Sequence, residues 1–206
     1  MSGFSLNRRM LLEGVILAAA ISPLRWASAA AEEAAGVVAE LKGEAVAELN
    51  KQRRALKPRS PIYLGDTLDT SDQSRLRALL ARKTTLRLGA KTRVRIDQFI
   101  VNVGGELVLD SGALLLDTSS AKFPQGLKVQ SPFALIAVRG TRIFAGPIEG
   151  IFGVFVDRGS VDVTAGGQTV KLAAGEGTDI ASAGSAPGPI KKWGKPKIAK
   201  AMALVR

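Results

Sequence analysis

Apolar and polar residues alternate with a period of two through most of the chain between residues 36 and 182. Three stretches combine a glycine turn, this alternation and a following turn: residues 42–49, 104–109 and 157–163. Short strands that recur roughly every 8–12 residues, with no long amphipathic helix between them, are typical of all-β folds. The pattern predicts one all-β domain over 36–182, built as a β-sandwich or as a short β-solenoid or roll.

Charged residues follow one face of the strands predicted on either side of the turn at residues 89–92. Here arginine alternates with Leu, Val and Ile, so one face is basic and the other apolar. If Arg87, Arg93 and Arg95 share that face, they form a basic ridge. It is either an ordinary solvated strand face or a contact for anionic envelope polymers or phospholipid headgroups. Nucleic acid is not an expected partner, because aromatic residues that could stack on bases are scarce there.

The C-terminal segment, residues 183–206, differs in composition from the β-rich region before it. A run of Gly, Ala, Ser and Pro has the composition of a linker, and several lysines follow it, among them Lys191 and Lys192. Residues 198–205 are predicted to form a short helix. We expect a basic tail that is either solvated or in contact with membrane phosphate or an acidic partner.

The first 29 residues have the organisation of an export signal. A charged region with paired arginines precedes a short apolar run at residues 15–21, and an A-x-A cleavage pattern follows. The run is shorter than the roughly 20 residues that a membrane-spanning helix needs. Paired arginines favour the twin-arginine route, with the general secretory route as the alternative. We therefore expect a cleaved signal peptide over 1–29 and a periplasmic protein, on the evidence of Arg8, Arg9, Ala27 and Ala29.

The amino-acid composition limits the catalytic and metal-binding sites that the chain can form. The chain has 206 residues and a formal net charge of +11, and it contains neither histidine nor cysteine. It cannot assemble a serine–histidine or cysteine–histidine nucleophile, or a thiolate or imidazole metal site. A carboxylate-based hydrolase is the remaining catalytic alternative, although no pair of acids marks one. We expect a non-catalytic protein with no cofactor and no metal.

One stretch, A-L-I-A-V-R-G-T-R-I-F-A at residues 134–145, places charge between two β-prone runs. A charge in such a segment is costly unless it is paired or exposed. We expect Arg139 to be paired inside the fold and Arg142 to be the freer arginine. Gly140 would supply a special backbone conformation or a close approach, and Thr141 would satisfy a backbone group. The alternative is that this stretch contacts a ligand.

The segment D-T-L-D-T-S-D carries three closely spaced carboxylates, those of Asp66, Asp69 and Asp72. Clustered carboxylates can bind calcium, but this spacing is not that of an EF-hand loop. The dipeptide Gly65-Asp66 is also a common turn device, because Asp hydrogen-bonds to nearby backbone. The turn is the favoured interpretation.

Four pieces of the sequence, in order, resemble the FecR domain, which is named after a periplasmic sensor of iron–citrate uptake. They are residues 36–43, 64–70, 85–96 and 129–141, and the resemblance spans about 36–180. The last piece, V-Q-S-P-F-A-L-I-A-V-R-G-T, is the strongest, although serine stands at 131 where the family usually has threonine. The matching motif residues are Gly65, Asp66, Pro132, Val138, Arg139, Gly140 and Thr141.

The resemblance implies a non-catalytic domain that binds a protein partner in the envelope, as a sensor or scaffold component. Familiar signalling members also carry a cytoplasmic region, a membrane helix and a C-terminal receptor-contacting domain. We find none of these in the sequence, so we do not expect contact with a cytoplasmic sigma factor. The alternative function is a module that binds an anionic polymer or a membrane surface through its basic face.

Overall fold

The computed structural model describes residues 34–81, 84–100, 104–118 and 126–206, with only the backbone described at 98–100. All of the described residues belong to one compact unit of the chain. The four residues of the predicted export signal, Arg8, Arg9, Ala27 and Ala29, lie outside the described residues.

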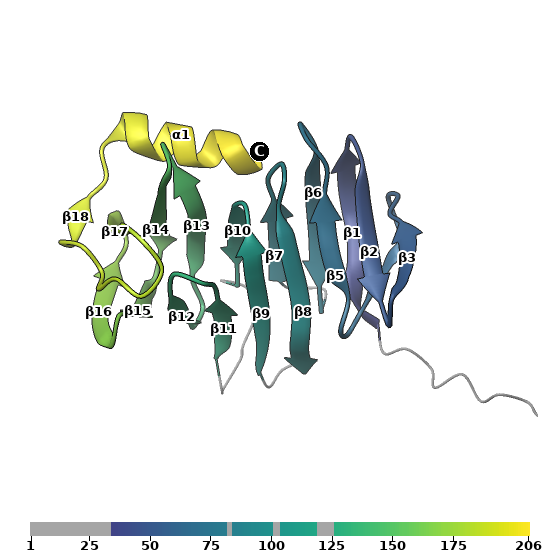
Figure 1. Ribbon diagram of the computed structural model, residues 1–206, viewed down its shortest axis with the longest axis horizontal. Helices are drawn as coiled ribbons and strands as arrows, with labels where there is room; N and C mark the ends of the chain where they lie inside the picture. The colour runs from purple at the N-terminus through teal and green to yellow at the C-terminus, as the bar shows by residue number, and fades with distance from the viewer. Residues whose placement is uncertain (1–33, 82–83, 101–103, 119–125) are drawn as a thin grey trace, which may run out of the picture. The chain divides into compact units, whose positions relative to one another are not determined.

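The described strands form two nine-stranded sheets (Figure 1). Sheet A has the strand order β18 (Lys191–Lys192), β17 (Glu176–Ile180), β14 (Ile151–Arg158), β13 (Arg142–Ile148), β10 (Leu114–Asp117), β7 (Thr84–Leu88), β6 (Arg75–Leu80), β1 (Ala34–Lys42) and β4 (Pro61–Tyr63). Sheet B has the order β16 (Gln168–Ala173), β15 (Ser160–Ala165), β12 (Leu135–Val138), β11 (Leu127–Gln130), β9 (Gly104–Ser111), β8 (Arg93–Ile100), β5 (Thr67–Thr70), β2 (Ala45–Leu49) and β3 (Gln52–Ala55).

The two sheets share one hydrophobic core, to which every other residue of most strands contributes a side chain. Leu76 and Leu86 come from sheet A, and Leu68, Ile96 and Leu107 come from sheet B; all five are buried. Neighbouring strands are antiparallel except for β9 and β11, which are parallel. The prediction of an all-β fold is confirmed, since the strands form two sheets that share one core.

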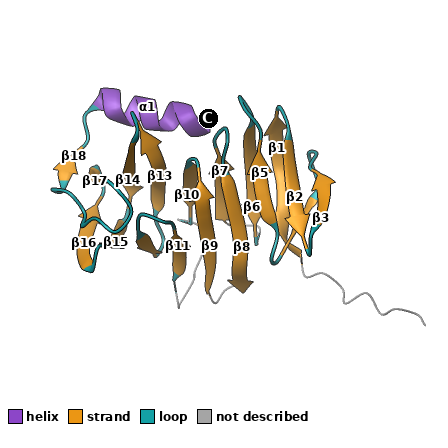
Figure 2. Ribbon diagram, in the orientation of Figure 1, coloured by secondary structure: helices purple, strands orange, loops and turns teal. Residues whose placement is uncertain are grey.

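A second, smaller core lies on the outer face of sheet A and includes residues of helix α1 (Lys195–Val205). This helix is the purple element in Figure 2. Strands β10, β13 and β14 bury consecutive residues, because one side of each strand faces the sandwich core and the other is covered, by the helix at β10 and β13 and by Trp193 at β14. The helix starts after Gly194 with a proline in its first turn, where the missing backbone N–H has no cost.

The segment at 183–206 is therefore not the solvated tail that its composition predicts. Trp193, Ala201, Met202 and Val205 are all buried against sheet A. Lysines also tie the helix to the domain, since Lys197 donates to both carboxylate oxygens of Asp179 at 2.6 and 2.8 Å. The predicted short helix at 198–205 is present, and packing continues past the predicted boundary at 182.

Candidate partner-binding site

The motif segment 129–141 forms strands β11 and β12 and the tight turn between them. The hydroxyl of Ser131 accepts hydrogen bonds from the backbone N–H groups of Phe133 and Ala134, at 3.3 and 3.0 Å. A threonine hydroxyl could make the same bonds, so serine preserves the turn chemistry of the family. Pro132 is exposed at this turn and lines a pocket of about 200 Å³, in which Phe133 stacks on Phe152 with ring centroids 4.6 Å apart.

Gly140 and Thr141 have architectural roles. Gly140 has a φ of +63°, in the left-handed region that favours glycine, and a Cβ there would meet no atom within 4 Å. Glycine is therefore favoured here by the backbone conformation, and not by the close approach of another atom. Thr141 is fully buried, and its backbone exchanges hydrogen bonds with Thr118: its N–H donates to the Thr118 hydroxyl at 3.0 Å, and its carbonyl accepts from the Thr118 N–H at 2.8 Å. The hydroxyl of Thr141 itself has no hydrogen-bond partner among the described residues, so the prediction that its side chain satisfies a backbone group is wrong.

Arg139, in the motif segment, and Arg142, which directly follows the segment, differ in exposure from what the sequence predicted. Arg139 follows the last residue of β12 with its side chain exposed, so it does not lie inside the fold as predicted, although it is not without a partner. Arg142, predicted to be the freer of the two, is half-buried on β13 and lies 3.4 Å from the carboxylate of Asp157. The burial pattern of a strand end explains this: Val138 faces the core, so the next side chain points to solvent.

Val138 and Arg139 line a groove of about 430 Å³ on the outer face of sheet B. One row of residues crosses it from strand to strand, and all four members are exposed: Lys128 of β11, Ala137 of β12, Asp162 of β15 and Lys171 of β16. The methyl side chain of Ala137 leaves room between its longer charged neighbours. The groove therefore combines a small apolar floor with both signs of charge and an arginine at its edge.

Gly65 and Asp66 build a turn, as predicted. The backbone N–H of Gly65 donates to the carbonyl of Ile96 at 2.8 Å, which links the turn to β8. The buried carboxylate of Asp66 accepts from the backbone N–H of Tyr63 at 2.7 Å and from the Arg54 guanidinium at 2.8 Å. The sequence analysis did not identify Arg54 as the partner, because it belongs to a different strand, β3.

The three carboxylates considered for calcium have separate partners. Asp69 pairs with Arg93 at 3.0 Å, and Asp72 pairs with Lys91 at 2.9 Å, whereas Asp66 pairs with Arg54. Lys91 hydrogen-bonds to Asp72 and holds the pKa of that carboxyl below its usual value. Over the described residues, no group of three acids is placed to hold a metal ion.

The predicted basic ridge does not form. Arg87 belongs to β7 in sheet A, whereas Arg93 and Arg95 belong to β8 in sheet B. Arg93 also lies among acids: its side chain is 3.0 Å from Asp69 and 3.7 Å from Asp110. Arg95 lies 3.4 Å from Asp97, and Lys191 and Lys192 are at the far edge of sheet A in β18. These five cations are thus dispersed over the domain.

Comparison with known proteins supports the fold. Two crystal structures of a putative anti-sigma factor from Parabacteroides distasonis ATCC 8503 are similar to this chain, each with a TM-score of 0.54. The sequence identities are 15% and 14%, and the alignments cover 65% of this chain and 62% of that chain. This chain therefore spans less than two thirds of that protein, and the likeness concerns the fold. A search of curated proteins found no match.

In the part of the chain that the structure describes, no helix has the length and apolarity to span a membrane. The family model for the FecR protein matches residues 66–175, which is more than half of the sequence. The matched region begins at the buried carboxylate of Asp66 and includes the whole segment from β11 to Thr141. As the resemblance of the motifs predicted, the chain belongs to the FecR family.

Proposed function

We propose that this chain is an exported, non-catalytic FecR-type domain that binds a protein partner in the bacterial envelope, as a sensor or scaffold component. Membership of the FecR family and the likeness to the fold of a putative anti-sigma factor support a regulatory role through protein contacts. The sequence features of residues 1–29 support export to the periplasm, by the twin-arginine route.

The observation that carries this proposal is the groove beside the V-R-G-T motif. Gly140 and Thr141 hold the end of β12 in place, and Arg139 extends from that fixed point at the rim of the groove. A planar guanidinium on a rigid backbone is a good recognition group for a carboxylate or for backbone carbonyls. Enrichment of arginine in the energetically dominant contacts of protein interfaces is consistent with this assignment.

The alternation of charge across the groove favours a protein over an anionic polymer. Glu106 of β9 lies next to Lys128 of β11, and Asp162 lies next to Lys171, so the row carries both signs of charge. A polymer of uniform negative charge would meet both acids, whereas a protein surface can supply complementary charges. Polymer binding would also weaken steeply as salt is added.

The test is site-specific photo-crosslinking in the envelope of living cells. A photoreactive amino acid at Ala137 should form a crosslink to one protein, because this position is the floor of the groove. Arg139→Ala should remove that crosslink and change the free energy of unfolding by no more than about 0.5 kcal/mol, since the side chain is exposed.

Arg53→Ala is the matched control, because Arg53 is an equally exposed arginine on the far edge strand of the same sheet, β3. It should leave the crosslink intact. A crosslink that persists in Arg139→Ala, or that disappears equally in both variants, would contradict the proposed site. A crosslinking signal lost at moderate ionic strength, with no protein captured, would favour the polymer.

A further inference from the structure

A small pocket on the outer face of sheet A lies beyond the motif groove and on the opposite sheet. Its volume is about 150 Å³, and it is lined by Arg77, Thr85, Arg87, Leu115, Asp117 and Arg142. Leu115 also belongs to the core beneath helix α1, so the pocket borders the edge of the helix-covered area. We propose that this pocket binds the phosphate group of an anionic ligand.

Three arginine side chains line this pocket, and the nearby carboxylates do not pair with all of them. Arg77 of β6 and Arg87 of β7 are directly opposite each other in the register of sheet A, an arrangement that is unfavourable for like charges. Arg77 hydrogen-bonds to Glu40, its partner on the other side. The other neighbour of Arg87 is Leu115, which offers no acceptor. Arg87 helps to lower the pKa of the Glu40 carboxyl, which Arg77 already hydrogen-bonds. Among the described residues, the Arg87 side chain is in no hydrogen bond or ion pair, so its guanidinium can donate to a ligand in the pocket.

The charges around the pocket leave one positive charge unbalanced. Arg142 lies 3.4 Å from Asp157, and Arg158 lies 3.4 Å from Asp117. Glu40 and Arg77 form a third pair. The cluster therefore contains three paired carboxylates and four guanidinium groups, and Arg87 carries the guanidinium group that is left over. The Nε atoms of Arg77 and Arg142 are also shielded from solvent without a hydrogen-bond acceptor. A single anionic group would balance the charge of this cluster.

The size and the donors of the pocket suit a phosphate group. A volume of about 150 Å³ is below the range of roughly 300–1,000 Å³ that is usual for drug-sized ligands, so only a small group can enter. Guanidinium groups from β6, β7 and β13 approach it from three strands, and the hydroxyl of Thr85 is a further donor. Arginine binds phosphate oxygens in a bidentate manner, which makes it the preferred side chain for such groups.

Titration of the chain from residue 31 onward with inorganic phosphate, at constant ionic strength, tests the site. Binding is followed through the arginine Nε–H signals in NMR, and those of Arg77, Arg87 and Arg142 should shift together. Arg87→Gln should weaken binding at least about tenfold, because a charged hydrogen-bond partner is lost. Arg87→Lys keeps the charge without the planar fork and should give an intermediate affinity. Arg95→Gln is the matched control, because Arg95 is an exposed strand arginine on the other sheet.

Vesicles distinguish the sources of the phosphate. Binding to phosphatidylcholine vesicles only when they contain phosphatidylglycerol, and loss of that binding in Arg87→Gln, would identify a lipid headgroup. Binding of free phosphate without vesicle binding would identify a soluble ligand. Equal effects of Arg87→Gln and Arg95→Gln would overturn the proposal, because the response would then reflect net charge alone. Absence of binding to both phosphate and vesicles would overturn it as well.

Discussion

The outer faces of the two sheets differ in what covers them. On sheet A, helix α1 covers β10 and β13 and Trp193 covers β14, and the outward side chains of Leu115, Phe144 and Phe155 form a second core beneath them. On sheet B, strands β11, β12 and β15 alternate buried and exposed residues, and their outward side chains meet solvent. Covered strands are apolar on both faces, whereas half-covered strands alternate.

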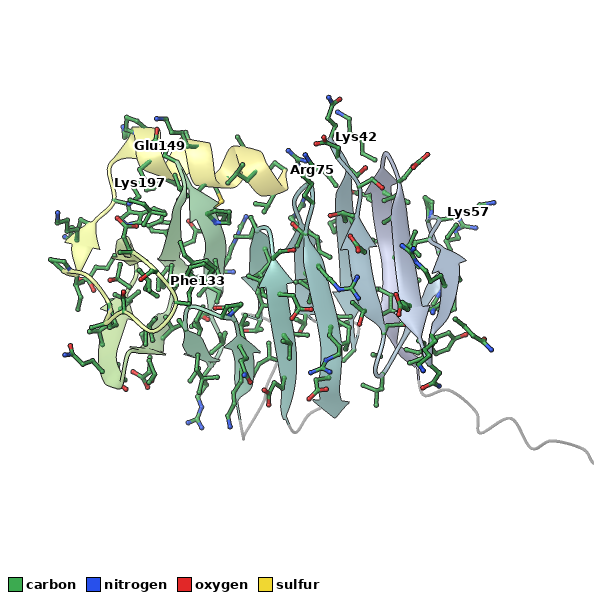
Figure 3. The ribbon with its side chains drawn as sticks, viewed as in Figure 1. Lys42, Lys57, Arg75, Phe133, Glu149 and Lys197 are labelled. Atoms are coloured by element: carbon green, nitrogen blue, oxygen red, sulfur yellow. The ribbon has the colours of Figure 1, made fainter. Side chains whose placement is uncertain are left out.

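The covered face also needs residues that let the cover approach closely. The indole ring of Trp193 stacks on Phe155, with ring centroids 5.0 Å apart, and lies directly over Gly153 and Gly177. The last turn of the helix reaches β7, where a Cβ at Gly89 would lie 2.5 Å from the carbonyl of Leu204. Arg75 lies close to this turn (Figure 3), and its guanidinium is 3.5 Å from the carbonyl of Ala203. Cations near a helix C-terminus are favourable.

The sharpest test of this difference removes one large side chain from each face. Trp193→Ala should cost about 3 kcal/mol or more of the free energy of unfolding, because a buried aromatic ring is lost and a cavity is left. Leu135→Ala on β12 should cost less than about 1 kcal/mol, since Leu135 is already 38% exposed. Urea denaturation of both variants measures the two values. Equal losses would mean that the packing of Trp193 on the covered face stabilises the fold no more than the exposed side chain of Leu135 does.

Substitutions at two glycines test why each face requires glycine, one on the covered face and one on the open face. Gly177→Ala should cost about 2 kcal/mol through overpacking, because the new Cβ would collide with the indole of Trp193 and lie 2.7 Å from the carbonyl of Val154. Gly140→Ala should cost about 1 kcal/mol, and only because its φ of +63° is unfavourable for alanine.

Asparagine distinguishes these two causes, since it tolerates the left-handed conformation better than alanine but is larger. Gly140→Asn should therefore be less destabilising than Gly140→Ala, whereas Gly177→Asn should be more destabilising than Gly177→Ala. Thermal unfolding of the four variants gives the order. The same order at both positions would show that a single mechanism operates on both faces.

The sequence predicted which residues face the core, but not which sheet they belong to. The period-two pattern of residues 85–96 correctly places the apolar residues inside. The turn at 89–92, however, carries the chain from sheet A to sheet B and does not join two paired strands. In a sandwich both sheets have an apolar inner face, so the pattern is the same for a hairpin and for a crossover. Arg87 and Arg93 consequently lie on different sheets.

Residues with local partners were predictable, and residues with distant partners were not. The Gly65-Asp66 turn and the Ser131 turn depend on hydrogen bonds within three residues, so their chemistry is visible in the sequence. The pair of Arg54 with Asp66 joins different strands and was missed. Burial of the C-terminal segment was also missed, although the continuous apolar runs in β10 and β14 are a signal that both faces are covered.

The smallest expected effect concerns the ion pairs that attach the helix to sheet A. Glu149, in the turn between β13 and β14, and Lys197, in the helix, both lie at this side of the domain (Figure 3). A hydrogen bond from Lys200 is the main cause that lowers the pKa of Glu149 below its ordinary value of 4.5, and Lys197 adds a smaller electrostatic contribution. Because the pKa is lower in the folded state, the pair stabilises the fold above pH 4.5 and loses this effect as the pH falls through the lowered pKa.

Carboxyl ¹³C NMR titration of Glu149 measures this directly. Lys200→Met should raise the pKa of Glu149 towards 4.5, and the dependence of stability on pH that this pair contributes should then diminish. Lys191→Met is the control, because Lys191 lies in β18 at the sheet edge and does not contribute to the lowered pKa. Glu149 is fully exposed, so the gain in stability is small and screened by salt. A pKa of Glu149 that is unchanged in Lys200→Met would mean that this ion pair does not form in solution.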